Sequence, residues 1–201
     1  MTENAHDWDA AYGGDQSPPW DIGRPQPQFE ALAGTGALRG RVLDCGCGTG
    51  EHTLLAAGEG AEAVGIDLSA RAIRRAQAKA EGRGLTARFE VADALTLRPE
   101  DLFDVVLDCG VFHVFDDCDR SSYVSSLHNL VRPGGTVYLM CFSDREPGEW
   151  GPRRVSESEL REAFAAGWQV ELTRTEMSVN PVNGQSGVQA WFATIRRDVD
   201  G

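Results

Sequence analysis

The chain has 201 residues, enough for one domain with a full core, and 41% of them are hydrophobic, as in soluble globular proteins. Its 19 basic and 31 acidic residues give a formal charge of −12, which argues against nucleic acid as a partner. No apolar run is long enough to cross a bilayer, the N-terminus carries no targeting pattern, and the five cysteines form no paired Cys-x-x-Cys units, so we expect a cytoplasmic protein with reduced thiols, no membrane contact and no metal.

The first 27 residues are polar, yet they contain more aromatic and proline residues than a disordered tail usually does. Trp8, Tyr12 and Trp20 lie in this segment, and Trp20 is part of a Pro-Trp-Asp run. We predict that residues 1–27 form a lid and that residues 28–201 form the domain beneath it.

A glycine-rich run follows the first predicted strand, at 41–45. Asp44 lies in this strand, and Gly46, Gly48 and Gly50 occupy every second position after it. Glycine allows backbone conformations that a side chain would block, and it lets the chain pass close to a ligand. The run is therefore typical of a nucleoside-binding loop.

A helix at 51–59 and a strand at 63–67 are predicted next, and this strand ends on Asp67. A carboxylate at that point is placed for ribose hydroxyls. The Gly-x-Gly-x-Gly spacing differs from the Gly-x-Gly-x-x-Gly of dinucleotide sites. Asp44 would repel a pyrophosphate but suits a ligand that carries an ammonium and a sulfonium.

The rest of the chain alternates between helical and extended patterns. The predicted elements are a helix that Ser69 caps and that ends at Gly82 and Gly84, strands at 87–91 and 103–108, a helix at 119–131, a strand at 136–141, a helix that begins at Ser156, and strands at 168–175 and 189–195. This order predicts an α/β fold with a seven-stranded, mostly parallel sheet and helices on both faces. Turn residues between the last two strands favour their antiparallel pairing; they are Asn180, Pro181, Asn183 and Gly184.

Ligands of open α/β sheets bind at the carboxyl ends of the strands. Asp93 and Ala94 follow the third predicted strand, and Cys109 follows the fourth. Asp93 either contacts the ligand or is an ordinary turn acid; its place after the third strand favours contact.

The run from Asp44 to Gly50, together with Asp67, closely resembles motif I of the class I S-adenosylmethionine-dependent methyltransferases. This resemblance covers about residues 28–197. It implies a Rossmann-like sheet in which the final strand lies antiparallel between the fifth and sixth. It also implies S-adenosylmethionine as cofactor and S-adenosylhomocysteine as product.

The same resemblance implies roles for individual residues. Those implied at the methionine part are Asp44, Gly46, Cys47, Gly48, Gly50 and, beneath it, Cys109. Asp67 is implied to bind the ribose, Leu68 to flank the adenine, and Asp93 and the Ala94 amide to bind the adenine ring.

The N-terminal segment is similar to the start of the thiopurine and halide/thiol methyltransferase group, in which aromatic residues close over the cofactor. This similarity implies that Trp8, Tyr12 and Trp20 contact the cofactor, with Tyr12 in the place of a tryptophan. The run 112–115 and the Cys-Phe-Ser-Asp loop look more like bacterial methyltransferases that act on heterocyclic or quinone-like hydroxyls.

The methyl acceptor is expected beyond the fourth and fifth strands. Its predicted contacts are Phe112, His113, Phe142, Asp144, Arg145 and Trp150. His113 is the best-placed general base, because an imidazole titrates near neutral pH. The alternative is a packed, hydrogen-bonded histidine, since transfer to an anionic acceptor needs no base.

We hypothesise in-line transfer of a methyl group to a small molecule, an aromatic or heterocyclic hydroxyl or thiol ahead of a halide or hydrosulfide. A non-catalytic S-adenosylmethionine-binding module is the alternative from another class. A short-chain oxidoreductase is disfavoured because no Tyr-x-x-x-Lys pair occurs. Neither nucleic acid nor a membrane is expected as a partner, and the protein is expected to be a monomer or a homodimer.

Overall fold

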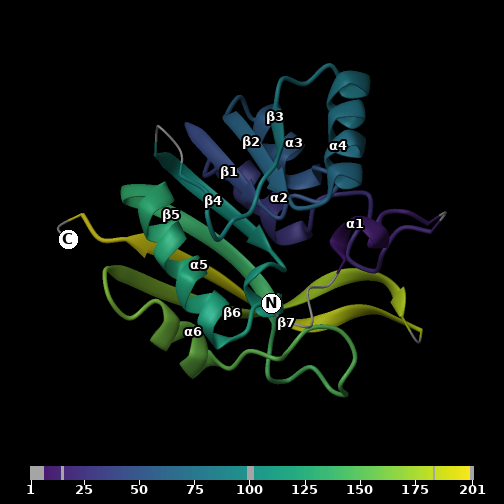
Figure 1. Ribbon diagram of the computed structural model, residues 1–201. Coiled ribbons are helices and arrows are strands. Elements are labelled where there is room, and N and C mark those ends of the chain that lie inside the picture. The colour runs from purple at the N-terminus through teal and green to yellow at the C-terminus, as the bar shows by residue number, and fades with distance from the viewer. Residues whose placement is uncertain (1–6, 15, 99–101, 183, 200–201) are drawn as a thin grey trace.

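The computed structural model describes residues 7–14, 16–98, 102–182 and 184–199. Its strands form one sheet in the order β3-β2-β1-β4-β5-β7-β6 (Figure 1). They are β1 (Arg41–Cys45), β2 (Glu62–Asp67), β3 (Arg88–Val91), β4 (Phe103–Cys109), β5 (Val131–Phe142), β6 (Trp168–Val182) and β7 (Gln185–Arg197). The pairs from β3 to β5 are parallel, whereas β7 runs antiparallel to β5 and β6. The predicted Rossmann-like sheet with its antiparallel last strand is thereby confirmed.

Helices cover both faces of the sheet (Figure 1). They are α1 (Trp8–Ala11), α2 (Pro27–Gly34), α3 (Glu51–Gly58), α4 (Ala70–Arg83), α5 (Asp117–Leu130) and α6 (Glu157–Ala163), with a 3₁₀ turn at Phe112–Val114. Ser69 caps α4 by accepting a hydrogen bond from the Ala72 amide, and Ser156 forms a capping box with Glu159 at the start of α6. Both predicted helix starts are therefore correct.

The core consists of layers on the two sides of the sheet, because successive residues of a strand point to opposite faces. On one side, Leu43 packs with Tyr123 of α5 and Phe164 just after α6. On the other side, Val42 packs with Phe29 of α2. This alternation gives the sheet an apolar layer on each face.

The last hairpin is longer than predicted. Asn180 and Pro181, interpreted as turn residues, lie inside β6, and Asn183 lies outside the described residues. Burial of Met177 and Val188, which pair across the two strands, extends the hairpin past the end of β5. Tertiary packing here outweighs local turn preference.

Two other boundaries differ from prediction. Helix α2 was not predicted, although Pro27 stands at its first position, a common helix start. Strand β5 begins at Val131 because a register shift against β4 accommodates the Pro-Gly-Gly run that was expected to precede the strand.

The cysteines are free thiols. Burial raises the pKa of Cys45, Cys47, Cys109 and Cys141 above the ordinary thiol value. Within the described ranges, His, Cys, Asp and Glu side chains nowhere gather in threes as a metal site. The same residues include no helix with the length and apolar character that a bilayer crossing requires.

Candidate functional site

The glycine loop joins β1 to α3 at the carboxyl edge of the sheet. The Cys47 amide donates to the Ile66 carbonyl of β2 at 2.8 Å, which holds the loop against the neighbouring strand. Gly48 has a φ of 52°, and a Cβ added there would lie 2.9 Å from the Tyr12 hydroxyl oxygen. Glycine is therefore required at position 48 both by its backbone conformation and by the approach of the N-terminal segment.

Asp67 ends β2 beside this loop. One carboxylate oxygen accepts from the Gly48 amide at 2.9 Å, and the other accepts from the Ser69 amide at 2.8 Å. Burial raises the pKa of Asp67. The neighbouring Leu68 side chain is 53% exposed. The carboxylate is thus fixed at the loop, next to an apolar surface that could contact a planar ring.

Asp44 is buried below the loop and tied to α3. Its Oδ2 accepts from the Thr53 amide at 3.0 Å and from the Thr53 hydroxyl at 2.7 Å. Burial raises the pKa of Asp44 to about 7. The observed contacts are therefore internal to the β1–α3 turn, and Thr53 is a partner that the sequence reasoning did not identify.

The aromatic residues of the N-terminal segment meet over the glycine loop. The Trp20 indole donates to the Tyr12 hydroxyl at 2.8 Å, and the Trp8 and Trp20 ring centroids are 5.7 Å apart. The Thr49 hydroxyl donates to the Asp21 carboxylate at 2.8 Å. The structure thus brings the three predicted aromatics together and connects their segment to the loop.

Helix α1 is fixed at the start of α4. One oxygen of Asp9 accepts from the Ser69 hydroxyl at 2.8 Å and from the Arg71 amide at 2.9 Å. Arg75 donates to the Tyr12 carbonyl at 2.8 Å. Arg71 and Arg75 of α4 therefore help to hold the N-terminal segment.

Asp93 and Ala94 lie in the turn after β3. An Asp93 oxygen accepts from the Leu95 amide at 2.9 Å, so this residue does have the turn contact of the alternative interpretation. The Ala94 carbonyl accepts from the Ser126 hydroxyl at 2.7 Å, which ties the turn to α5. Ser126 was not predicted, because its contact is made across 32 residues of sequence.

Asp108, near the end of β4, organises the turn that contains Cys109 and Gly110. Its fully buried carboxylate accepts from the Val111 amide at 2.8 Å, the Phe112 amide at 3.1 Å and the Tyr123 hydroxyl at 3.0 Å. Burial raises the pKa of Asp108 to about 7. Sequence reasoning noted this aspartate only as the end of a strand and missed its structural contacts.

His113 is packed and hydrogen-bonded. This environment is the alternative that the sequence allowed beside the role of a general base. Its Nδ1 accepts from the Phe142 amide at 2.9 Å, so in the neutral ring Nε2 carries the hydrogen. That second nitrogen lies beside the Gly110 backbone. Burial lowers the pKa of His113 to about 3. A neutral imidazole has one basic lone pair, and the Phe142 amide occupies it.

The predicted acceptor contacts lie in different environments. Phe112 is fully buried between Phe164, at 5.9 Å between ring centroids, and the Arg120 guanidinium, and its predicted contact with the acceptor stays a prediction. Its backbone amide donates to the buried Asp108 carboxylate, which holds the residue in the core. Phe142 is also buried; it lies at the end of β5 and packs against Trp150, with 5.6 Å between ring centroids.

The loop after β5 carries the remaining predicted contacts. Asp144 and Arg145 are exposed, and Asp144 forms an ion pair with Arg174 of β6 at 3.4 Å. Arg154 donates to the carbonyls of Trp150 and Pro152 at 2.6 and 2.8 Å, and so closes the loop on itself.

Comparison with known proteins decides the family. A family model described as a methyltransferase domain matches residues 42–135. The chain is 34% identical to 2-heptyl-1-hydroxyquinolin-4(1H)-one methyltransferase of Mycobacteroides abscessus, over 100% of the chain and 94% of the relative. The chain belongs to the S-adenosylmethionine-dependent methyltransferases.

Two further similarities extend over nearly the whole methyltransferase. It is 29% identical to probable thiol methyltransferase 2 of Arabidopsis thaliana, over 95% of the chain and 87% of the relative. A solved structure described as "Conversion of a Disulfide Bond into a Thioacetal Group during Echinomycin Biosynthesis" is 38% identical with a TM-score of 0.86, over 96% of this chain and 92% of that chain. The protein is an enzyme that methylates small molecules.

The residues of this methyltransferase fit S-adenosylmethionine. Its loop has glycine with a positive φ at positions 46, 48 and 50. Because glycine has no side chain, the loop backbone is accessible at the edge of the sheet. Asp67 provides a fixed carboxylate and Leu68 an exposed apolar side chain beside it. The arrangement therefore offers polar and apolar contacts of the kinds that a nucleoside requires.

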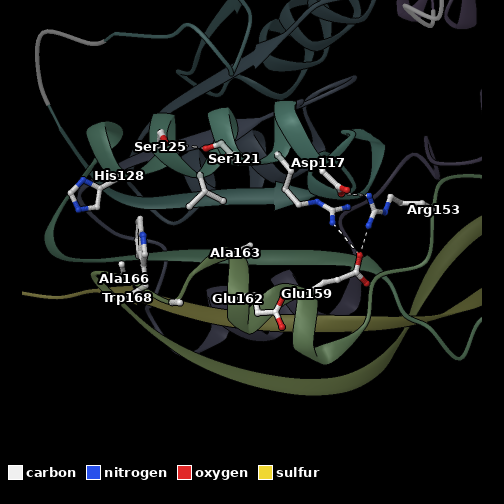
Figure 2. A pocket seen from close by; sticks show the side chains of 13 residues that line it. Asp117, Ser121, Ser125, His128, Arg153, Glu159, Glu162, Ala163, Ala166 and Trp168 are labelled. Carbon is white, nitrogen blue, oxygen red and sulfur yellow. Dashed lines mark hydrogen bonds and ion pairs between the residues drawn. The ribbon is translucent and has the colours of Figure 1, made fainter.

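A separate groove of about 650 Å³ lies between α5 and α6 of the methyltransferase (Figure 2). At one end, Arg153 bridges Asp117, at 2.7 Å, and Glu159. At the other end lie His128 and Trp168. Among the described residues, the lining includes no side chain that we predicted to contact the cofactor or the acceptor.

Proposed function

We propose that the enzyme transfers the methyl group to an aromatic or heterocyclic hydroxyl or thiol that ionises near neutral pH. The observation that carries this proposal is the hydrogen bond from the Phe142 amide to His113 Nδ1, because it removes the best-placed general base. An acceptor that loses its own proton to solvent is independent of such a base. Thiols and acidic heterocyclic hydroxyls meet this condition better than ordinary alcohols.

The acceptor region supports a planar substrate. The Phe142 ring lies against both His113 and Trp150, with centroid distances of 5.0 and 5.6 Å. Trp150 is the partly exposed ring of this cluster, and contact with it favours an aromatic acceptor over an inorganic anion. The whole-chain similarity to the hydroxyquinolinone methyltransferase agrees with this choice. Asp144 and Arg145 remain candidate rim contacts.

We further propose that the loop from Gly46 to Gly50, including Cys47, and Cys109 hold the methionine part. Asp67 binds the ribose, Leu68 flanks the adenine, and Asp93 and the Ala94 amide bind the ring. Asp44 contributes its negative charge and also holds the loop in place, because its Oδ2 accepts hydrogen bonds from the Thr53 amide and hydroxyl. Trp8, Tyr12 and Trp20 cover the cofactor.

When bound, S-adenosylmethionine supplies a methyl group on a positively charged sulfur. The protein then has to align the acceptor with that methyl group and exclude water. Phe142 and Trp150 orient the acceptor plane, and the N-terminal aromatics exclude solvent from the glycine loop. Asp108 holds the Val111 and Phe112 amides, and so fixes the turn after β4.

A halide or hydrosulfide acceptor is the second candidate. The 27% identity to thiocyanate methyltransferase 1 of Brassica oleracea, over 86% of the chain, favours it, because thiocyanate is also an inorganic anion. Such an acceptor is anionic, so it would also need no base.

The test is methyl transfer from labelled S-adenosylmethionine to iodide, hydrosulfide, aryl thiols, phenols and hydroxylated quinolines, each with a no-acceptor control. We expect turnover with aryl thiols or hydroxyquinolines, and a pH dependence that follows the pKa of each acceptor. Turnover with iodide or hydrosulfide alone would replace the proposal by the second candidate. A pH profile that is the same for all acceptors would contradict the ionisation argument.

A further inference from the structure

The N-terminal segment contains a tight turn at residues 18–21, which carries Trp20. The Asp21 amide donates to the Pro18 carbonyl at 3.0 Å, so the turn is closed by its own backbone. Pro18 and Pro19 have no amide hydrogen. The turn therefore presents mainly carbonyl oxygens to its surroundings, and a docking partner must supply donors.

Asn180, on the far part of the β6–β7 hairpin, supplies these donors. Its side-chain amide donates to the Pro18 carbonyl at 3.0 Å and to the Asp21 carbonyl at 2.8 Å. Its backbone amide donates to the Pro19 carbonyl at 2.7 Å. One residue thus binds three carbonyls of the turn. Because both side-chain partners are carbonyl oxygens, the nitrogen of the Asn180 amide must face them.

The hairpin around Asn180 extends beyond the part that completes the sheet. Pairing between β5 and β7 ends at Phe142 and Ala190, whereas β6 and β7 continue together to Val182 and Gln185. Gln26 forms two hydrogen bonds with the Ser178 backbone, at 2.8 and 2.9 Å, and so fixes the hairpin to the start of α2. The extension is a support for the N-terminal segment.

From the turn, two contacts lead to the glycine loop. Asp21 accepts from the Thr49 hydroxyl at 2.8 Å, and Trp20 donates to Tyr12, whose hydroxyl lies over Gly48. Displacement of the turn would move both contacts together. Asn180 itself makes none of these contacts with the loop.

We infer that Asn180 is a positioning residue for cofactor binding: it seats the turn at 18–21 and thereby places Trp20 and Asp21 over the glycine loop. This inference rests on the proposed lid role of the N-terminal aromatics. It assigns to the hairpin a function in holding S-adenosylmethionine that acts entirely through the lid.

The experiment compares Asn180→Asp with Asn129→Asp in the full-length enzyme. Aspartate keeps the shape of asparagine but cannot donate, and Asn129 is exposed on α5, so the control makes the same charge change elsewhere. Binding of S-adenosylhomocysteine is measured by calorimetry, and folding by thermal unfolding. We expect Asn180→Asp to weaken binding about 10-fold, the loss of one to two hydrogen bonds, with little change in melting temperature. Asn129→Asp should bind normally.

Trp20→Ala tests whether the lid binds the cofactor, and the double variant of Asn180→Asp with Trp20→Ala tests whether Asn180 acts through the lid. If Asn180 acts through the lid, the double variant binds no more weakly than the weaker single variant, because the two changes remove the same contact. Hydrogen exchange of the Trp20 and Asp21 amides should rise in Asn180→Asp. An Asn180→Ala variant, which adds no charge, should give the same result if the aspartate variant folds poorly.

The contrary outcomes are distinct. Normal affinity of both Asn180 variants with weakened Trp20→Ala overturns the role of Asn180 and leaves the lid intact. Normal affinity of Trp20→Ala as well overturns the lid and the inference with it. A lower melting temperature with unchanged affinity makes Asn180 a stabilising residue only, and strictly additive losses in the double variant contradict an effect through the lid.

Discussion

Replacement of His113 tests whether the enzyme uses a general base. His113→Ala removes the acceptor of the buried Phe142 amide and leaves a space the size of an imidazole. We expect a loss of about 3 to 5 kcal/mol in unfolding free energy, of which roughly 1 to 3 comes from the unpaired amide and the rest from the cavity. His113→Asn places an oxygen near the position of Nδ1, so it should restore the amide hydrogen bond and much of the stability.

The two variants are assayed by chemical denaturation and by the pH dependence of kcat/KM, with His128→Asn on α5 as the matched control. If His113 is structural, the asparagine variant keeps the shape of the wild-type profile and loses less than about 10-fold in rate, whereas loss of a general base typically costs 10²- to 10⁴-fold. A loss of that larger size in a stably folded His113→Asn enzyme, together with disappearance of a limb near neutral pH, would refute the reasoning.

Three further predictions concern the cofactor side and the core. Trp20→Ala should weaken S-adenosylhomocysteine binding about 10-fold in calorimetry, since the hydrogen bond to Tyr12 and a ring contact are lost; unchanged affinity would remove the lid assignment. Gly48→Ala should abolish most cofactor binding, because residue 48 has a φ of 52° and a Cβ there would approach the Tyr12 hydroxyl. Gly58→Ala is the control: its Cβ meets no atom within 4 Å, so this variant should bind normally. Equal affinity of the two variants would contradict the requirement for glycine at position 48. Burial raises the pKa of Asp108 from 3.8 to about 7, so the protonated carboxyl contributes its full stabilisation below pH 3.8, and this contribution is lost as the pH rises through 7. The unfolding free energy of Asp108→Asn, measured with urea, should therefore depend less on pH over this window. An unchanged pH dependence would argue against the raised pKa.

The glycine loop that is proposed to hold the cofactor could be predicted from sequence as a loop because its signals are local. Positive φ angles at three positions of one loop favour glycine there, namely Gly46, Gly48 and Gly50, and Asp67 ends the adjacent strand. Short-range backbone requirements of this kind appear directly as residue type and spacing. The strand order followed from a resemblance, since periodicity alone gives only the α/β class.

The acceptor half depends on contacts between distant residues. Whether His113 is a base depends on the Phe142 amide, 29 residues away, and the burial of Phe112 depends on Phe164. Asn180 was interpreted as a turn residue, although it lies in a strand and binds a segment 159 to 162 residues earlier. Such pairings leave no periodic signal in a single sequence, so only the folded chain reveals them.

The thiols near the glycine loop lie close to the proposed site of a reactive methyl donor. A sulfonium methyl donor alkylates good nucleophiles, and a thiolate is among the best that a protein offers. Cys45, Cys47 and Cys109 lie in or beside the loops that are proposed to hold this donor, and burial raises the pKa of each thiol, so that each stays protonated and poorly reactive. We therefore expect these three thiols to react more slowly with the donor than an ordinary cysteine does.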